Sequence, residues 1–116
     1  VLLIEQFRIG PYMRGDLHPW ILEPIAGRID PGEMPETTAH REALEEANLT
    51  LGALEKVAFY YPTPGAVTEY LYSYVAICDL PQEAAGLGGV LGEAEDIRSH
   101  ILTYDALMGL VAVAKP

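Results

Sequence analysis

One well-marked helix, expected over Pro35–Ala47, constrains the fold of this chain more than any other feature. Pro35 suits the first helical position, where its fixed φ fits the helix and its missing N–H is not needed. Glu36 places a negative charge at the positive end of the helix dipole. Asn48 follows at the position where a left-handed residue ends many helices, and Asn is the usual second choice after Gly.

This helix carries both apolar side chains and acids. The apolar residues recur at three- and four-residue spacing, as Ala39, Ala43, Leu44 and Ala47, and we expect this stripe to dock on a sheet. Glu42, Glu45 and Glu46 share one helix face, which we expect on the opposite side, pointing into a cleft. Like charges at this spacing weaken an isolated helix, and Mg²⁺, which prefers carboxylate oxygens, would compensate them.

A simpler interpretation exists for the three glutamates taken alone. They could form a solvated acidic helix face, with Arg41 as a local ion-pair partner. The acids by themselves therefore do not establish a metal site.

The segments around the helix predict strands separated by turns. Branched and aromatic residues predict strands at Val1–Phe7, Trp20–Ile29, Leu54–Tyr61, Val67–Cys78 and Arg98–Thr103. Gly and Pro predict loops at Gly10–Pro19 and Pro81–Glu95, before a closing helix at Asp105–Ala114. Tyr70, Tyr72 and Tyr74 alternate along one strand, so they should share a sheet face, where packing is favoured over stacking on a base. The pattern indicates the α+β class.

The overall charge restricts the partners of the chain. Lys and Arg total 7 against 17 Asp and Glu, a formal net charge of −10. This argues against a basic surface for nucleic acid or anionic membrane, while an acidic chain fits divalent cations or simple solubility. No apolar run reaches the roughly 18 residues that suggest a membrane span. The single cysteine, Cys78, is expected to be a buried structural thiol in a reducing cytoplasm.

The acids of the helix belong to a longer pattern. It runs Gly27, five residues, Glu33, seven residues, and then Arg41-Glu42-Ala43-Leu44-Glu45-Glu46. This pattern resembles the Nudix box, whose last glycine is Asn48 here. Because Asn tolerates the left-handed conformation, we expect the helix end to survive this departure.

The resemblance extends beyond the box to the ADP-ribose pyrophosphatase branch of that family. It rests on Ile4–Arg8, Trp20–Gly27, Pro64-Gly65 with Glu69, and Glu93–Asp96. It implies a mixed β-sheet packed between helices, an α/β/α sandwich, as one domain over residues 1–116. It also implies a homodimer, and a β-rich segment preceding this chain in the full protein.

The resemblance implies a role for each box residue. Mg²⁺, or Mn²⁺ in its place, would be held by Glu42, Glu45 and Glu46, with Glu93 and the carbonyl of Ala26. Catalysis would fall to Glu93, with Glu95 as the alternative base, together with Glu45 and Glu46. Gly27, Glu33 and Arg41 would orient the loop and the helix.

The resemblance also implies a substrate. The expected contacts are Arg8, Trp20, Glu23, Gly65 and Glu69, and the expected reaction converts ADP-ribose and water to AMP and ribose 5-phosphate. Two alternatives remain: another nucleoside diphosphate sugar such as GDP-mannose, and a binding module without catalysis. Every box acid is present, which favours an enzyme over the binding module.

Overall fold

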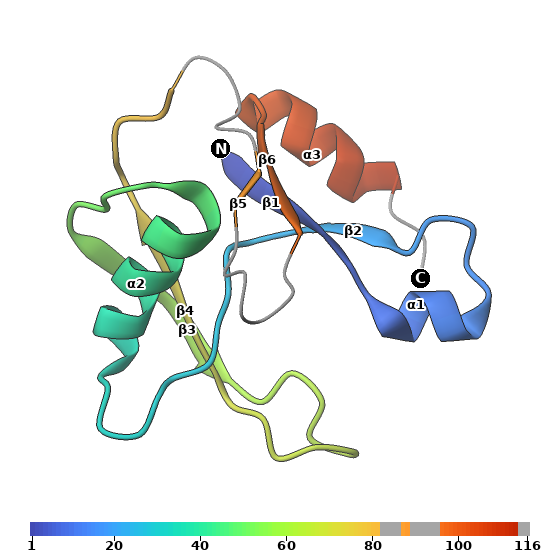
Figure 1. The fold of residues 1–116 in the computed structure, drawn as a ribbon, viewed down its shortest axis with the longest axis horizontal. Coiled ribbons are helices and arrows are strands. Elements are labelled where there is room, and N and C mark those ends of the chain that lie inside the picture. Colours follow the sequence, from blue (N-terminus) through green and yellow to red (C-terminus); the bar gives the residue numbers. More distant parts are fainter. Residues whose placement is uncertain (82–86, 89–95, 114–116) are drawn as a thin grey trace.

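The computed structural model describes residues 1–81, 87–88 and 96–113 (Figure 1). The strands are β1 (Leu2–Phe7), β2 (Trp20–Glu23), β3 (Leu54–Tyr60), β4 (Leu71–Ala76), β5 (Leu87–Gly88) and β6 (Ile97–Ile101). The helices are α1 (Ile9–Arg14), α2 (Pro35–Ala47) and α3 (Tyr104–Val113). These elements confirm the expected α+β class.

The strands form two antiparallel groups. One is a four-stranded sheet in the order β2-β1-β6-β5, and the other is the β3-β4 hairpin. All four described pairings are antiparallel, where the sequence led us to expect a mixed sheet. In Figure 1 the four-stranded sheet runs between α2, at the left, and α3, at the upper right. Helix α2 contacts β5 and β6.

The two faces of the four-stranded sheet differ. One face carries Ile4, Ile97 and Ser99, all buried. Leu2 lies on this same face by strand alternation and packs against the cluster of Ala43, Ala47 and Leu49 in and after α2, so this face is turned toward α2. We call it the α2 face of the sheet. The core of the described chain therefore lies between this face and α2.

Helix α2 begins and ends where the sequence predicted. Pro35 occupies its first turn, and Asn48 ends it in the left-handed conformation, with φ 52° and ψ 40°. The N–H of Asn48 donates to the carbonyl of Leu44 at 3.0 Å, and that of Leu49 donates to Ala43 at 3.1 Å. Asn48 therefore ends the helix in the same conformation that the glycine of the box would adopt, and the helix cap is kept.

Two predicted segments were wrong. The loop expected at Gly10–Pro19 contains α1, because its helix breakers Gly10 and Pro11 fall in the first turn, where helices tolerate them. The strand expected over Trp20–Ile29 ends at Glu23, because Pro24 has no N–H to donate to a strand ladder.

Other boundaries moved less. The loop expected at Pro81–Glu95 contains the short strand β5, and most of it lies outside the described residues. The shared face of the tyrosines is confirmed, since the rings of Tyr70 and Tyr72 lie 5.3 Å apart. Cys78 is half-buried and packs against the Ala43 core cluster, close to its predicted role. Among the described residues, no helix has the length and apolar character that crossing a membrane requires.

Asn48 allows a test of the helix end. A branched residue is disfavoured in the left-handed conformation, so Asn48→Val should lower the free energy of unfolding by about 1–2 kcal/mol, whereas Asn48→Gly should be neutral or stabilising. Urea denaturation would measure both. The control is Thr50→Val, an exposed neighbour whose φ is not positive. Equal stability of the two valine variants would contradict this account of the cap.

Candidate active site

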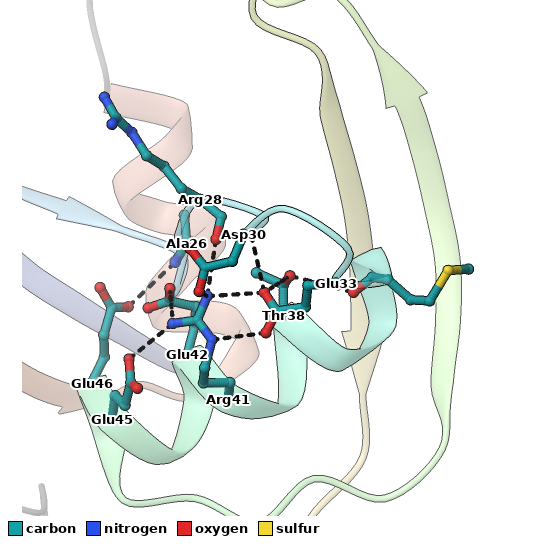
Figure 2. Close-up of polar contacts among 10 residues, drawn as sticks. Ala26, Arg28, Asp30, Glu33, Thr38, Arg41, Glu42, Glu45 and Glu46 are labelled. Carbon is teal, nitrogen blue, oxygen red and sulfur yellow. Dashed lines mark hydrogen bonds and ion pairs between the residues drawn. The ribbon is translucent and has the colours of Figure 1, made fainter.

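The guanidinium of Arg41 lies at the centre of a carboxylate cluster (Figure 2). Its Nε donates to Glu33 at 3.0 Å, and its Nη1 donates to Glu42 at 2.8 Å and to Glu45 at 3.1 Å. Its Nη2 donates to the carbonyl of Arg28 at 2.9 Å. Asp30 adds a longer ion pair at 3.6 Å. One side chain of α2 therefore holds both the loop that precedes the helix and two acids of the helix itself.

Glu33 is fixed from several directions. Arg41 binds both of its carboxylate oxygens, the hydroxyl of Thr38 donates to Oε1, and the N–H of Asp30 donates to Oε1 at 3.3 Å. These bonds, that from Arg41 foremost, lower the pKa of Glu33 from its ordinary value of 4.5 to about 2. The same contacts raise the pKa of Arg41. Glu33 and Arg41 thus connect the loop before α2 to the helix.

Glu42 and Glu46 are buried, at 9% and 2% exposed. The N–H of Ala26 donates to Glu46 Oε2 at 3.3 Å. A Cβ added to Gly27 would coincide with the carboxylate of Glu42. Only glycine leaves room for that carboxylate against the backbone, which gives the first residue of the box a physical reason.

The expected division of α2 into an apolar face and an opposite acidic face was wrong. Ala43 and Ala47 are buried beside Glu42 and Glu46, while Leu44 is 55% exposed. Successive residues of a helix are about 100° apart, so each adjacent Glu-Ala pair can turn toward the same side. The acids therefore lie in the interface between α2 and the Ala26 segment rather than on the solvent side.

The cluster holds more acid than base. Arg41 faces four carboxylates, those of Asp30, Glu33, Glu42 and Glu45, and Glu46 lies one turn from Glu42. Figure 2 shows the side chain of Arg28 directed away from them. This excess of carboxylate suits a cation. Within residues 1–81, 87–88 and 96–113, however, no three acid, His or Cys side chains are grouped so as to enclose a metal ion.

The expected substrate contacts fall into two places. Arg8, which follows β1, forms an ion pair with Glu23, the last residue of β2, and Trp20 packs edge-on against Phe7 with ring centres 5.9 Å apart. Gly65, in contrast, lies in the loop between β3 and β4, as does Glu69, and Figure 1 places that loop at the lower edge of the view, away from α2. The described chain thus brings together Arg8 and Glu23, whereas Trp20 points to the opposite face of the sheet and the loop residues lie elsewhere.

Two further expectations concern the catalytic loop and the cleft. Glu93 and Glu95, the expected bases, lie outside the described residues. Two hollows on the described surface are not lined by the acids of α2. One is lined by Ala47–Thr50, Asp79 and Pro81, and the other by Pro64–Thr68, including Gly65.

Sequence reasoning missed several partners of the acids. Thr38 binds Glu33 five residues away, and the hydroxyl of Tyr74 donates to Glu36 at 3.1 Å. Burial first, and then this bond, raise the pKa of Tyr74. The Thr38 contact could have been predicted, because Thr38 lies in the first turn of a helix that begins soon after Glu33. No nearby residue in the sequence indicates that Tyr74 contacts Glu36.

The Glu33–Arg41 contact predicts a specific acid sensitivity. Because folding lowers the pKa of Glu33 from 4.5 to about 2, its stabilising contribution is complete above pH 4.5 and is lost as the pH falls toward 2. Glu33→Gln should therefore have a lower melting temperature than the wild type at pH 6. This difference in melting temperature should become smaller as the pH falls from 4.5 to 2. The exposed Glu55→Gln variant is the control. A difference from wild type that is constant with pH would refute the assignment.

Comparison with known proteins finds relatives that match most of this chain. The chain is 38% identical to an ADP-ribose pyrophosphatase of Haemophilus influenzae over 104 residues, covering 88% of this chain and 48% of the relative. It is 40% identical to an ADP-ribose pyrophosphatase of Escherichia coli K12 over 105 residues, covering 90% and 49%. It is also 37% identical to a GDP-mannose pyrophosphatase of Enterobacter sp. strain 638 over 111 residues, covering 96% and 56%.

The chain spans about half the length of the curated relatives it matches. The model of the NUDIX domain matches residues 1–114, which include the Arg41 cluster, the Gly27 contact and both sheet groups. By this match and by the identity to these relatives, the chain belongs to the NUDIX domain family.

Proposed function

We propose that this chain carries the catalytic acids of an enzyme that hydrolyses the pyrophosphate bond of ADP-ribose, giving AMP and ribose 5-phosphate. One observation carries the proposal: Glu42 and Glu46 are buried together on the side of α2 that faces Ala26 and Gly27. The relatives named ADP-ribose pyrophosphatase support the substrate. The alternative is another nucleoside diphosphate sugar, which the GDP-mannose pyrophosphatase relative supports.

The burial of the two acids has a cost that a cation would offset. A buried carboxylate is stable only where charges or hydrogen bonds compensate its lost hydration. Arg41 forms ion pairs with Glu33, Glu42 and Glu45, so its one positive charge faces three negative charges. A hard divalent ion held by Glu42 and Glu46 would add positive charge to this acid-rich cluster.

The proposed ion is Mg²⁺, with Mn²⁺ as its alternative. Glu42 and Glu46 would be its main ligands, with Glu45, the carbonyl of Ala26 and Glu93 completing the set. When bound, such an ion neutralises phosphate charge and lowers the pKa of a bound water. Arg41 would keep Glu45 close to the ion without releasing it to solvent, since it holds Glu45 at 3.1 Å.

The remaining steps fall to other residues of the chain. Glu93, with Glu95 as the alternative, would take the proton from the attacking water, a step worth about 10² to 10⁴ in rate. Arg8 would bind substrate phosphate. Trp20, Gly65 and Glu69 would complete the substrate contacts, and Glu23 would belong to the same site through its ion pair with Arg8.

We further propose that the chain acts as one domain of a cytoplasmic homodimer. Several large apolar side chains on and after α1 are open to solvent, among them Met13 and Leu17 at 74% and 90% exposed. Exposed apolar clusters of this kind are typical of protein interfaces. The strongly acidic charge makes nucleic acid and anionic membranes poor partners.

The metal assignment predicts the behaviour of one variant. Glu46→Gln removes a ligand charge while keeping the shape of the side chain, so turnover of ADP-ribose should fall by about 10² or more. Circular dichroism and the melting temperature should show that the fold survives. Glu55→Gln, at an exposed site on β3, should keep wild-type turnover. Unchanged turnover in Glu46→Gln would remove Glu46 from the proposed ligand set.

The substrate assignment predicts the order of activities in a panel. With Mg²⁺, the full protein should hydrolyse ADP-ribose with a higher kcat/KM than GDP-mannose or other nucleoside diphosphate sugars, and EDTA should abolish the activity. Phosphate analysis of the products should find AMP and ribose 5-phosphate. Equal or faster turnover of GDP-mannose would favour the alternative substrate, and activity in EDTA would argue against a metal.

A further inference from the structure

Arg8 and Glu23 form a two-point ion pair. Nε of Arg8 donates to Glu23 Oε2 at 3.2 Å, and Nη2 donates to Glu23 Oε1. Such paired bonds fix the plane of a guanidinium as well as its position. The side chain of Glu23 is 20% exposed and that of Arg8 is 45% exposed, so the acid is the more enclosed partner and the guanidinium the more accessible one.

The backbones of both residues are also fixed. The N–H of Arg8 donates to the carbonyl of Pro19 at 2.9 Å, and Arg8 immediately precedes α1. Glu23 pairs with Ile4 across β2 and β1. The ion pair therefore connects the end of β2 to the start of α1. Because both backbones are held by hydrogen bonds, the two side chains stay within reach of each other.

The pair lies on the same side of the sheet as the acids of α2. Glu23 is opposite Ile4, whose side chain is buried on the α2 face, and opposed residues of an antiparallel pair point to the same face. Glu23 also precedes Ala26 by three residues, and three residues span at most about 10 Å. Since the N–H of Ala26 donates to Glu46, the short segment from Glu23 to Ala26 connects the ion pair to the acids of α2.

We propose that Glu23 is a positioning residue, which holds the guanidinium of Arg8 in place for the diphosphate of the substrate rather than touching the substrate itself. This inference rests on the proposed function, because it assumes a diphosphate beside α2. A guanidinium has five N–H donors, so one carboxylate can orient it and still leave it suited to a phosphate.

The physical effect is preorganisation. A free arginine side chain loses much rotamer freedom when it binds a ligand, and this loss weakens affinity. Glu23 restricts the rotamers of Arg8 already in the folded protein, so less freedom is lost when the ligand binds. The opposite effect is also conceivable for a carboxylate at this place, since Glu23 could compete with phosphate for Arg8, and the two effects change affinity in opposite directions.

The test compares four variants of the full protein: Glu23→Ala, Arg8→Ala, the double variant and Glu5→Ala. Calorimetry would measure the Kd of ADP-ribose in EDTA, where turnover is suppressed, and steady-state kinetics with Mg²⁺ would measure KM and kcat. We expect Glu23→Ala to raise Kd and KM roughly 3- to 10-fold with kcat within about twofold. When Arg8 is already alanine, Glu23→Ala should alter the Kd by less than about twofold, because Glu23 then has no guanidinium to position.

Glu5→Ala is the matched control. Glu5 lies on the same sheet and also accepts from a basic side chain, with His100 Nε2 at 2.7 Å, but it points to the face opposite Ile4. Its loss should leave Kd unchanged. An effect of Glu5→Ala as large as that of Glu23→Ala would assign the change to general loosening of the sheet and overturn the proposal.

Other outcomes separate the proposal from its alternatives. A wild-type Kd in Glu23→Ala, or an equal loss in the background that lacks Arg8, would overturn it, and a lower Kd would show competition instead. If the wild-type protein binds ADP-ribose but hydrolyses no nucleoside diphosphate sugar, the proposed reaction fails while the Kd comparison still decides the role of Glu23. If it neither binds nor hydrolyses ADP-ribose when Mg²⁺ is present, both proposals fail.

Discussion

The structure depends first on the guanidinium of Arg41, which is shared by carboxylates from two segments of the chain. It binds Glu33 in the loop before α2, and it binds Glu42 and Glu45 on α2 itself. A planar group with several donors can serve partners on different sides at once, which a lysine ammonium at the end of a flexible stem could not do with the same geometry. This one side chain therefore fixes the loop against the helix, and the placement of the Gly27 segment follows from it.

The close approach of that segment has an electrostatic consequence. The backbone at Gly27 leaves space only for the carboxylate of Glu42, and the N–H of Ala26 lies at Glu46. Glu42 and Glu46, one turn apart on α2, are thus both buried in this interface, where charges interact more strongly than in water. The arrangement places two carboxylates in one enclosed region. It is understandable as a site prepared for a cation, which is why the proposed reaction gives these two residues the central role.

The four-stranded sheet separates two kinds of polar contact. Its α2 face carries the Arg8–Glu23 pair, while the opposite face carries the Glu5–His100 contact and the ring of Trp20. Strand alternation alone assigns residues to these faces once the register is known. The register itself joins residues far apart in sequence, such as Ile4 and Ser99, and no local pattern in the chain specifies it.

Local rules were enough to predict the helix at Pro35–Ala47, its end at Asn48 and the spacing of the box, because each depends on residues within a few positions of one another. The sequence alone thus determined that acids recur along one helix. Only the tertiary structure decided that Glu42 and Glu46 are buried beside Ala43 and Ala47 while Leu44 is exposed, because the side of a helix that is covered depends on what packs against it. The partner of Arg8 was decided in the same way, since Glu23 reaches it only after β1 and β2 have paired.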